Sequence, residues 1–415
     1  MTAEARAQLE NVILPFWLRH GVDERRGGFH TCFDNRGRQL VSTEKFTWSQ
    51  GRFVWLLARA ARLATDGLLD VDADRLVSVA ERGARFLADH VVRPDGMCHF
   101  VVTADGTPTY GPAGETHSVY ADCFVVMGLA ELARTTGSTA WLEVAEPLLS
   151  RATADIRANR AATPPYAVPD GHVAFGPRMI LLNTRLEHAR ALLHLDLMTS
   201  ATLADLAAER DAMLRHRTPD GTFREMIPDV PDDTSLIARH RVPGHALEGI
   251  WVALEAGDLL GESDEVTDAE LLSSIEALCA SAWDREHGGL FRYVDAEGAT
   301  EPRGTGGDTP YEMLVRSTWS TKLWWVHTEA AYTTALAARR YGDRDAGRWA
   351  GLIWDYTLRT FPGRDEGEEW VQIRDRGGRP MDQVVALPVK DPFHIARNLM
   401  QLVELDAEVP IDSHR

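Results

Sequence analysis

The sequence contains little cysteine and no long apolar run. Its four cysteines, Cys32, Cys98, Cys123 and Cys279, are scattered and form no CxxC pair, which favours free thiols in a reducing cytoplasm. No apolar run approaches the ~20 residues of a membrane span. The segment TAEARAQLEN after Met1 lacks the apolar core of a secretion signal. We therefore expect a cytoplasmic protein that does not cross a membrane.

Basic residues are also scarce relative to acidic ones. Lysine and arginine number 44 against 62 aspartates and glutamates, and the formal net charge is −18. Nucleic acids and anionic membrane surfaces both select basic patches, so this balance argues against both as partners. The hydrophobic share of 44% is sufficient for a packed core, and the 12 tryptophans suit a small, weakly charged ligand such as a sugar.

Several catalytic and metal-binding motifs are missing as well. The chain has no HExxH, no CxxC pair and no EF-hand loop, so we predict no metal site. It has no GxSxG motif of a nucleophile elbow. The glycine-rich stretch GTGGDTP (304–310) lacks a preceding strand pattern and the GK[ST] of a phosphate loop, so a flexible loop is the better interpretation.

What the sequence does contain is an internal repeat. DERRGGFHTCFDNRG (23–37) matches DREHGGLFRYVDAEG (284–298), and KFTWSQGRFVW (45–55) then matches KLWWVHTEAAY (322–332). The repeat aligns three pairs of residues: Lys45 with Lys322, Trp48 with Trp325, and Arg52 with Glu329. Fainter copies of the same order, a glycine-bearing hairpin and then an apolar helix, recur at steps of about 60 to 80 residues. These copies indicate six units.

The helical patterns fall into two classes that differ in polarity. One class is apolar nearly all round, which predicts burial on more than one side, and its members begin near residues 45, 117, 179, 244, 321 and 392. The other class shows one-sided periodicity and runs roughly over 3–19, 73–92, 140–158, 201–216, 266–283 and 344–361. Six inner and six outer helices predict an all-α fold, the (α/α)6 barrel. An open αα-solenoid is the alternative, and the apolar inner ring favours closure.

No linker-like tract divides the chain, so residues 1–415 are predicted to form a single (α/α)6-barrel catalytic domain. The short β-hairpins that precede the inner helices would gather at one end of the barrel, with FRYVD and WVQIRD as candidate strands. Helix N-termini converge there, and their unpaired N–H groups suit hydroxyl and oxyanion ligands. The residues at the inner-helix starts are therefore the site candidates.

These starts carry two histidines with several possible partners. In VPGHALEGIW (242–251), a Pro-Gly break precedes His245, Glu248 and Trp251, whose spacing places them on one helix face. His394 lies at the last start. Histidine can exchange a proton at neutral pH, a carboxylate can orient it, and arginine can stabilise charge on oxygen. The other candidates at these starts are Lys45, Trp48, Arg52, Tyr120, Asn183, Lys322, Trp324, Trp325, His327, Glu329 and Arg397.

Each candidate also has a purely structural interpretation. The HxxE spacing is common by chance, His394 could be a core or capping histidine, and tryptophan pairs are more often core than ligand surface. The repeat suggests that Arg52 could be a buried ion-pair partner of Glu329. The histidines on outer helices and loops are interpreted as surface or packing residues: His20, His90, His194, His216 and His287.

Several segments of the chain, in order, resemble those of one known family. They are FWLRHGVDERRGGFHTCF, KFTWSQGRFVW, MILLN, PGHALEGIW, KLWWVHTEAA and KDPFHIARNL. Together they resemble the N-acylglucosamine 2-epimerase family, which includes cellobiose 2-epimerases and mannose isomerases, nearly end to end. The resemblance implies an (α/α)6 barrel and proton transfer at C2, beside the C1 carbonyl of an opened sugar. In this resemblance His245 and His394 match the acid/base histidines, Glu248 the helper carboxylate, and Arg52 the residue near the sugar oxygens.

Two positions depart from parts of this family. The cellobiose and mannose branches usually carry a histidine in an N-x-H arrangement, whereas this chain has Asn183, Thr184 and Arg185. This difference argues against a disaccharide substrate, and MILLN resembles the acylglucosamine branch. Acylglucosamine epimerases tend to have proline where this chain has Val326. Whether Arg185 or another group replaces the missing histidine stays open.

The sequence thus predicts a cofactor-independent sugar 2-epimerase acting on N-acylglucosamine and N-acylmannosamine or a related hexose pair. One histidine would remove the C2 proton, Arg52 would hold the charged O1, and the other histidine would return a proton from the opposite face. No cofactor is expected, because the carbonyl already acidifies the C2 proton. A homodimer is implied by the resemblance alone. Substrate contacts are predicted for Lys45, Trp48, Tyr120, Asn183, Trp251, Lys322, Trp325 and Glu329.

Three alternatives stay open. Mannose–fructose isomerisation or mannose/glucose 2-epimerisation would share the first proton transfer. An inverting glycoside hydrolase needs two carboxylates flanking the bond, and Glu248 and Glu329 are available. A sugar-binding protein without catalysis would use the same aromatic residues.

Overall fold

Six apolar helices form the inner ring of the molecule. The computed structural model describes residues 1–261, 265–298, 300–365, 367–383 and 387–408. The inner helices begin within a few residues of the positions that the apolar patterns predict. They are α3 (Thr47–Thr65), α5 (Val119–Thr136), α7 (Phe175–His194), α10 (Pro243–Leu260), α13 (Trp324–Tyr341) and α15 (Phe393–Ala407).

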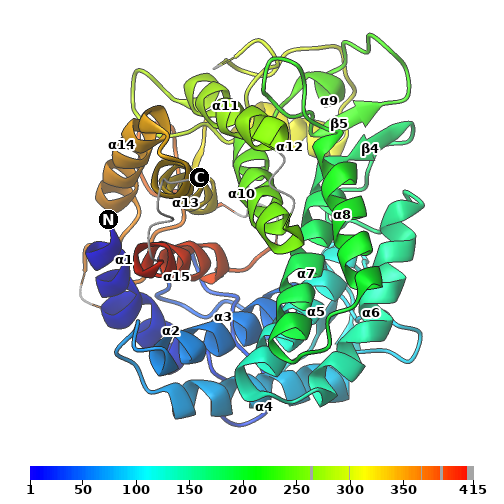
Figure 1. Cartoon of the computed structure of the whole chain (residues 1–415), viewed down its shortest axis with the longest axis vertical. Coiled ribbons are helices and arrows are strands. Elements are labelled where there is room, and N and C mark those ends of the chain that lie inside the picture. The colour runs from blue at the N-terminus through cyan, green and yellow to red at the C-terminus, as the bar shows by residue number, and fades with distance from the viewer. Residues whose placement is uncertain (262–264, 299, 366, 384–386, 409–415) are drawn as a thin grey trace.

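The outer helices alternate with the inner ones along the chain and surround them (Figure 1). The first is a nearly continuous helical run of α1 (Thr2–Gln8), η1 (Leu9–Ile13) and α2 (Leu14–His20). The others are α4 (Ala73–His90), α6 (Ala140–Arg157), α8 (Ser200–Leu214), α11 (Glu265–Ala282) and α14 (Arg344–Thr360). The predicted (α/α)6 barrel is confirmed.

The difference in polarity between the two classes follows from their burial. In α4 the buried residues recur every three or four positions, as at Leu76, Val79, Ala80 and Leu87, so only one face meets the inner ring. In α5, by contrast, nearly every residue from Val119 to Ala133 is buried. An inner helix packs against two neighbouring inner helices and the outer layer, which leaves it no polar face.

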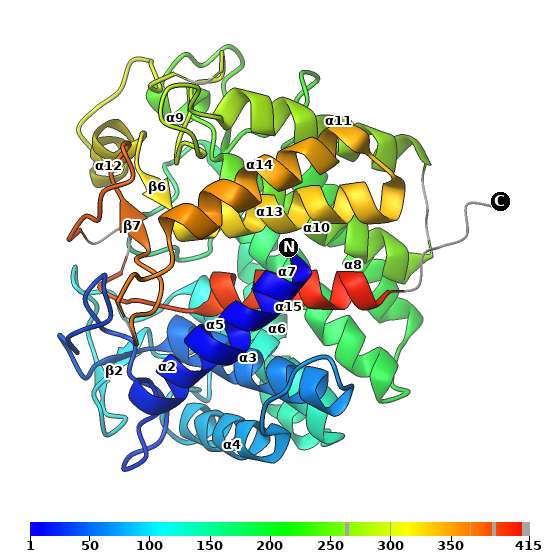
Figure 2. The ribbon, with the colours of Figure 1, turned by 90° about the vertical axis from the view of Figure 1, so that its left-hand side faces the viewer.

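Short antiparallel strands lie at one end of the barrel, where the inner helices begin (Figure 2). One sheet joins β1 (Lys45–Phe46), β2 (Val101–Val102) and β3 (Pro108–Thr109). A second pairs β4 (His172–Ala174) with β5 (Met226–Pro228), and a third pairs β6 (Lys322–Leu323) with β7 (Ile373–Arg374). We call this end the mouth.

The predicted strands at the mouth are only partly correct. WVQIRD contains the two-residue strand β7, whereas FRYVD contributes only isolated bridges at Val294 and Asp295. Two short helices were not predicted: α9 (Leu236–Arg239) and α12 (Pro310–Thr318). The glycine-rich stretch 304–310 leads into α12, where Thr309 and Glu312 form a capping box.

The internal repeat recurs as a repeated structural device. Lys45 Nζ donates to Asp23 Oδ2 at 2.9 Å and to the Gly27 carbonyl at 2.6 Å. Lys322 Nζ donates in the same way to Asp284 Oδ2 at 3.2 Å and to the Gly289 carbonyl at 3.3 Å. In both copies a buried lysine therefore ties the glycine turn of a hairpin to the start of an inner helix.

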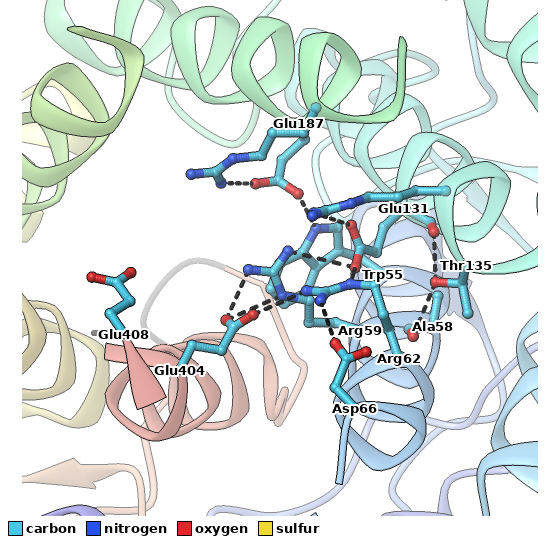
Figure 3. A network of polar contacts seen from close by, with 12 residues as sticks. Trp55, Ala58, Arg59, Arg62, Asp66, Glu131, Thr135, Glu187, Glu404 and Glu408 are labelled. Atoms are coloured by element: carbon cyan, nitrogen blue, oxygen red, sulfur yellow. Dashed lines mark hydrogen bonds and ion pairs between the residues drawn. The ribbon is translucent and has the colours of Figure 1, made fainter. Parts of the chain in front are cut away.

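The opposite end of the barrel holds a buried charge network (Figure 3). Glu404 on α15 accepts hydrogen bonds from Arg59 at 2.8 Å and from Arg62 at 2.9 Å, both on α3. Arg62 also donates to Glu131 on α5 at 3.1 Å. Glu187 on α7 accepts from the Trp55 indole at 2.9 Å. Ion pairs thus join the C-terminal halves of the inner helices, and we call this group the far-end network.

The cysteines are free thiols, and all four are buried. Among the residues that the structure describes, no helix is long and apolar enough to cross a membrane.

Candidate active site

A cavity of about 610 Å³ opens at the mouth. It is lined by residues from the starts of inner helices and from the loops and strands that precede them. Eight of the residues singled out from the sequence contribute to its lining: Trp48, Arg52, Tyr120, His245, Glu248, Trp324, Trp325 and His394. Inner-helix starts distant in sequence thus converge on one space, as the barrel architecture predicts.

His245 lies in the first turn of α10. Its Nδ1 is 3.1 Å from both carboxylate oxygens of Glu225, and its side chain is 31% exposed. Burial alone would lower the pKa of His245, but the charge and hydrogen bond of Glu225, together with the charge of Glu248, raise that pKa above its usual value. His245 is therefore disposed to carry a proton at neutral pH.

Glu225 was missed by the sequence analysis. It directly precedes β5 and lines the cavity, and its side chain is 7% exposed. Burial raises its pKa, but the charge and hydrogen bond of His245 and the charges of His240 and His216 together bring the pKa of Glu225 below its usual value. The one available signal was its position in the hairpin TPDGTFREMI, just before an inner-helix start.

His394 has the opposite environment at the start of α15. Its Nδ1 is 2.8 Å from Glu329 Oε1, and its Nε2 is 3.3 Å from Arg52 Nη2. Arg397 Nη2 also lies 3.3 Å from Nδ1, but the carboxylate is nearer and can only accept, so Nδ1 carries the hydrogen and Nε2 has the lone pair. Burial and the positive charge of Arg52 lower the pKa of His394 well below its usual value. His394 is therefore disposed to be a neutral base.

The Trp325 indole packs against both histidines. Its ring centroid is 5.2 Å from that of His245 and 5.8 Å from that of His394. This close approach requires glycine at position 244, where a Cβ atom would lie 2.4 Å from the Trp325 ring. Two histidines whose pKa values shift in opposite directions thus line the same cavity and contact one indole.

Arg52 pairs with Asp391, and the predicted pairing with Glu329 is wrong. Arg52 Nη1 lies 3.3 Å from Asp391 Oδ2, which also accepts from the Ser49 hydroxyl at 3.1 Å. The guanidinium packs over the Phe124 ring at 4.0 Å. These contacts hold Arg52 beside the Nε2 atom of His394.

Glu329 and Glu248 share a different arginine. Arg397 Nη2 donates to Glu248 Oε1 at 2.5 Å and to Glu329 Oε1 at 2.6 Å, and the side chain of Arg397 is 1% exposed. Burial opposes the charged form of Arg397, but both carboxylates raise its pKa, so it stays positive. The carboxylate within hydrogen-bond distance of His245 is therefore Glu225, while Glu248 binds Arg397 and adds its charge to those that raise the pKa of His245.

The carboxylates and His394 also meet the geometric condition for a metal site. Within the described part of the chain, ligand atoms of Glu248, Glu329 and His394 all lie within 4.8 Å of one another. The guanidinium of Arg397, however, already supplies the positive charge between the two carboxylates. A divalent cation there would have to displace it, so the donor set does not fit a metal ion.

Five of the predicted substrate contacts lie behind the cavity wall. Lys45 and Lys322 are wholly buried in the hairpin ties, where burial lowers the pKa of each, that of Lys322 to about 8. Trp251 is 1% exposed and donates to Glu329 at 2.8 Å, and Glu329 is 0% exposed. Asn183 is 1% exposed, and its amide has no hydrogen-bond partner among the described residues.

Arg185 does not replace the missing mid-chain histidine. Its guanidinium donates to Thr153 on α6 at 2.9 Å and lies 3.2 Å from Asp205 on α8. Both partners are on outer helices, so Arg185 leaves the inner ring on the side away from the cavity.

Comparisons with known proteins agree with this geometry. A family model described as N-acylglucosamine 2-epimerase (GlcNAc 2-epimerase) matches residues 27–397. The N-acylglucosamine 2-epimerase of Bos taurus is 28% identical over 400 residues, covering 95% of this chain and 88% of the bovine protein. The cellobiose 2-epimerase of Bacteroides fragilis is 23% identical over 423 residues, covering 96% of this chain and 98% of its own.

Solved structures show the same fold at lower identity. Cellobiose 2-epimerase from Bacillus thermoamylovorans B4167 superposes with a TM-score of 0.78 at 18% identity, covering 97% of this chain and 98% of its own. A D-mannose isomerase gives a TM-score of 0.73 at 14% identity, covering 97% and 96%. An α-mannanase from Bacteroides thetaiotaomicron gives 0.57 at 8% identity, covering 95% and 94%.

Proposed function

The chain belongs to the N-acylglucosamine 2-epimerase family, and from this membership we propose that it interconverts N-acylglucosamine and N-acylmannosamine. The reaction inverts C2 of the open-chain sugar. One observation carries the proposal: two histidines that favour opposite protonation states face one cavity, with an arginine beside the neutral one. Inversion at carbon needs a base and an acid on opposite faces.

In the proposed mechanism, His394 is the base for one direction of the reaction. Its Nε2 lone pair takes the proton from C2, and the electron pair of the C–H bond forms an enolate with the C1 carbonyl. Arg52, which lies 3.3 Å from that Nε2 atom, is placed to stabilise the negative charge on O1. Protonated His245 then gives its proton to C2 from the opposite face. In the reverse direction the two histidines exchange roles.

Two carboxylates determine which histidine is the base and which is the acid. Glu329 accepts the Nδ1 hydrogen of His394, which directs the lone pair of Nε2 towards the cavity. Glu225 stabilises the proton on His245. Because the carbonyl acidifies the C2 proton, the proposed reaction needs only these side chains.

The glycoside hydrolase alternative fits the geometry poorly. Inverting hydrolases hold their two carboxyl groups about 6.5–9.5 Å apart, with a water between them. The ligand atoms of Glu248 and Glu329 lie within 4.8 Å of each other, and both bind Arg397. Neither carboxylate is placed opposite the other across a glycosidic bond.

Incubation with sugars in deuterated water tests the proposal. The panel is N-acetylglucosamine, N-acetylmannosamine, mannose and glucose, with NMR to follow deuterium at C2. We expect deuterium at C2 together with interconversion of the two acetylated sugars. Fructose formed from mannose would instead identify an isomerase. Absence of C2 exchange in every sugar would favour a binding protein.

The variant His245→Ala distinguishes the roles of the two histidines. In His245→Ala, His394 still exchanges the C2 proton on its own face, but no acid completes the inversion. We expect deuterium in one epimer of the acetylated pair and almost no conversion to the other. Equal loss of exchange from both epimers would contradict the assignment of one histidine to each face.

Three further proposals accompany this function. A cytoplasmic location is supported by the four free thiols. A homodimer rests on family membership, and light scattering of the purified protein tests it. Residues 1–415 are proposed to fold as one domain, which predicts a single cooperative unfolding transition.

A further inference from the structure

One side of the cavity is predominantly apolar. It is formed by Tyr166, Val168, Met226, Tyr311 and Leu314, which come from the loop before β4, from β5 and from α12. We call these five residues the apolar wall. Tyr311 packs in two hydrophobic clusters, one with Met226 and Val168 and one with Leu314, so the wall is continuous.

The apolar wall adjoins His245. Met226 directly follows Glu225, the carboxylate bound to His245. Val242, in the turn before His245, packs in the same cluster as Tyr311 and Leu314, and so does Trp325. A group attached to the carbon that His245 protonates would therefore lie against this wall.

Polar side chains lie in another part of the cavity lining. Gln372 donates from its side chain to the Asp391 carbonyl at 3.0 Å, and its backbone N–H donates to Asn35 at 2.9 Å. All three residues line the cavity, and Asp391 holds Arg52. These groups supply donors and acceptors for the hydroxyl groups of a sugar.

The wall is held in place before any ligand binds. The Tyr311 hydroxyl donates to His240 Nε2 at 2.8 Å, and the Tyr166 ring lies 5.5 Å from that of Tyr311. The capping box of Thr309 and Glu312 stabilises the start of α12. A preformed surface does not have to be ordered by the ligand, so its burial contributes more fully to binding.

We propose that the apolar wall binds the N-acyl group of the substrate and accepts acyl chains longer than acetyl. The inference rests on the proposed function, since the nitrogen that bears the acyl group is bonded to C2, the carbon between the two histidines. Of the nitrogen and oxygen substituents on the sugar, only this one is bonded directly to the reacting carbon. The cavity of about 610 Å³ falls within the ~300–1,000 Å³ that hold drug-sized ligands, which leaves room beyond an acetyl group.

A series of N-acylmannosamines with acetyl, propanoyl, butanoyl and pentanoyl groups tests the wall. Each buried methylene strengthens binding by up to about fourfold. In the unmutated protein, kcat/KM is therefore expected to rise through the first members of the series. In Leu314→Trp the indole fills the subsite, and the ratio of butanoyl to acetyl kcat/KM is expected to fall at least tenfold. In Leu314→Ala the optimum is expected to move to a longer acyl chain.

Met313 provides the matched control on the same helix. It is 50% exposed, so Met313→Trp adds the same indole to α12 outside the cavity, and its acyl-chain profile is expected to match that of the natural chain. The proposal would be overturned if, in the unmutated protein, kcat/KM fell with every carbon added to the acyl group. Equal effects of Leu314→Trp on every acyl chain would overturn it as well.

The failure of the proposed function has a different signature. If no N-acylated sugar exchanges its C2 proton, the proposed epimerisation itself is wrong. If N-acetylmannosamine is epimerised normally while longer acyl chains are rejected, only the subsite is wrong.

Discussion

The two ends of the barrel place buried charges in contrasting ways. In the far-end network, Glu404 accepts hydrogen bonds from two arginines, and Arg62 bridges it to Glu131. Each carboxylate there is neutralised by guanidinium groups, and burial of Glu404 is outweighed by Arg59 and Arg62, which keep its pKa low. At the mouth, His245 and His394 each use Nδ1 for a carboxylate. Both histidines line the cavity, and Nε2 of His394 lies 3.3 Å from Arg52 Nη2.

The contrast separates stability from reactivity. Groups whose hydrogen bonds are satisfied within the protein resist protonation and hold helices together. Groups with one atom directed to a cavity can pass a proton to a ligand. The same (α/α)6 barrel thus uses the starts of its inner helices for chemistry and their C-terminal halves for closure.

The largest expected effect is the loss of the base at the mouth. His394→Ala should lower kcat for epimerisation about 10³-fold, because general acid–base catalysis contributes ~10²–10⁴. Its melting temperature should change little relative to this loss. The matched control is His287→Ala, whose parent side chain is 40% exposed on a loop. Near-normal kcat in His394→Ala would contradict the two-histidine mechanism.

Removal of an arginine from the far-end network should have the opposite effect, a loss of stability with little change in kcat. Arg59→Met leaves Glu131 and Glu404 with fewer cationic partners in a buried site, which should cost about 3 kcal/mol of unfolding free energy. The folded fraction should keep its kcat. Urea unfolding measures the first quantity, and assays below the melting temperature measure the second.

An exposed arginine serves as the control for that experiment. Arg348 is 77% exposed and pairs with Asp345 on the surface of α14, so Arg348→Met should cost less than about 1 kcal/mol. Equal destabilisation by Arg59→Met and Arg348→Met would show that the network does not close the barrel.

The smallest effect is expected from a change of charge behind the base. Burial, Arg52 and then Arg397 lower the pKa of His394, while Glu248 raises it. Arg397→Gln removes a positive charge, so the pKa of His394 should rise and the acidic limb of the kcat/KM profile should move to higher pH. The sign follows because the base must be neutral to accept a proton.

Lysine at position 397 distinguishes charge from packing. Arg397→Lys keeps the positive charge, so its acidic limb should stay close to that of the natural chain even if kcat falls. An unshifted limb in Arg397→Gln would show that Arg397 only packs between Glu248 and Glu329.

Much of the helical framework could be predicted because helix patterns are local. The 3.6-residue periodicity of ADRLVSVAERGARFLADH predicts an outer helix over 73–92, and α4 spans Ala73–His90. The Pro-Gly break before His245 marks the start of α10 for the same reason. Once six inner helices are assigned, barrel closure brings His245 and His394 to one mouth although 149 positions separate them.

The partners of these residues could not be predicted in the same way. Arg52 binds Asp391 across a sequence separation of 339 residues, and the repeat pointed to Glu329 instead. Lys45 and Lys322 were predicted to contact the substrate because of their positive charge, but both are buried within their hairpins. Glu225 has no motif of its own and becomes a partner of His245 only because β5 lies beside the start of α10.

The sequence by itself determined which segments are helices, which faces are apolar and which histidines begin inner helices, because these properties depend on residues within a few turns of one another. The tertiary structure decided which carboxylate faces which histidine. It therefore also decided that His245 favours the proton and His394 the lone pair, because a pKa depends on burial and on charges from distant parts of the chain.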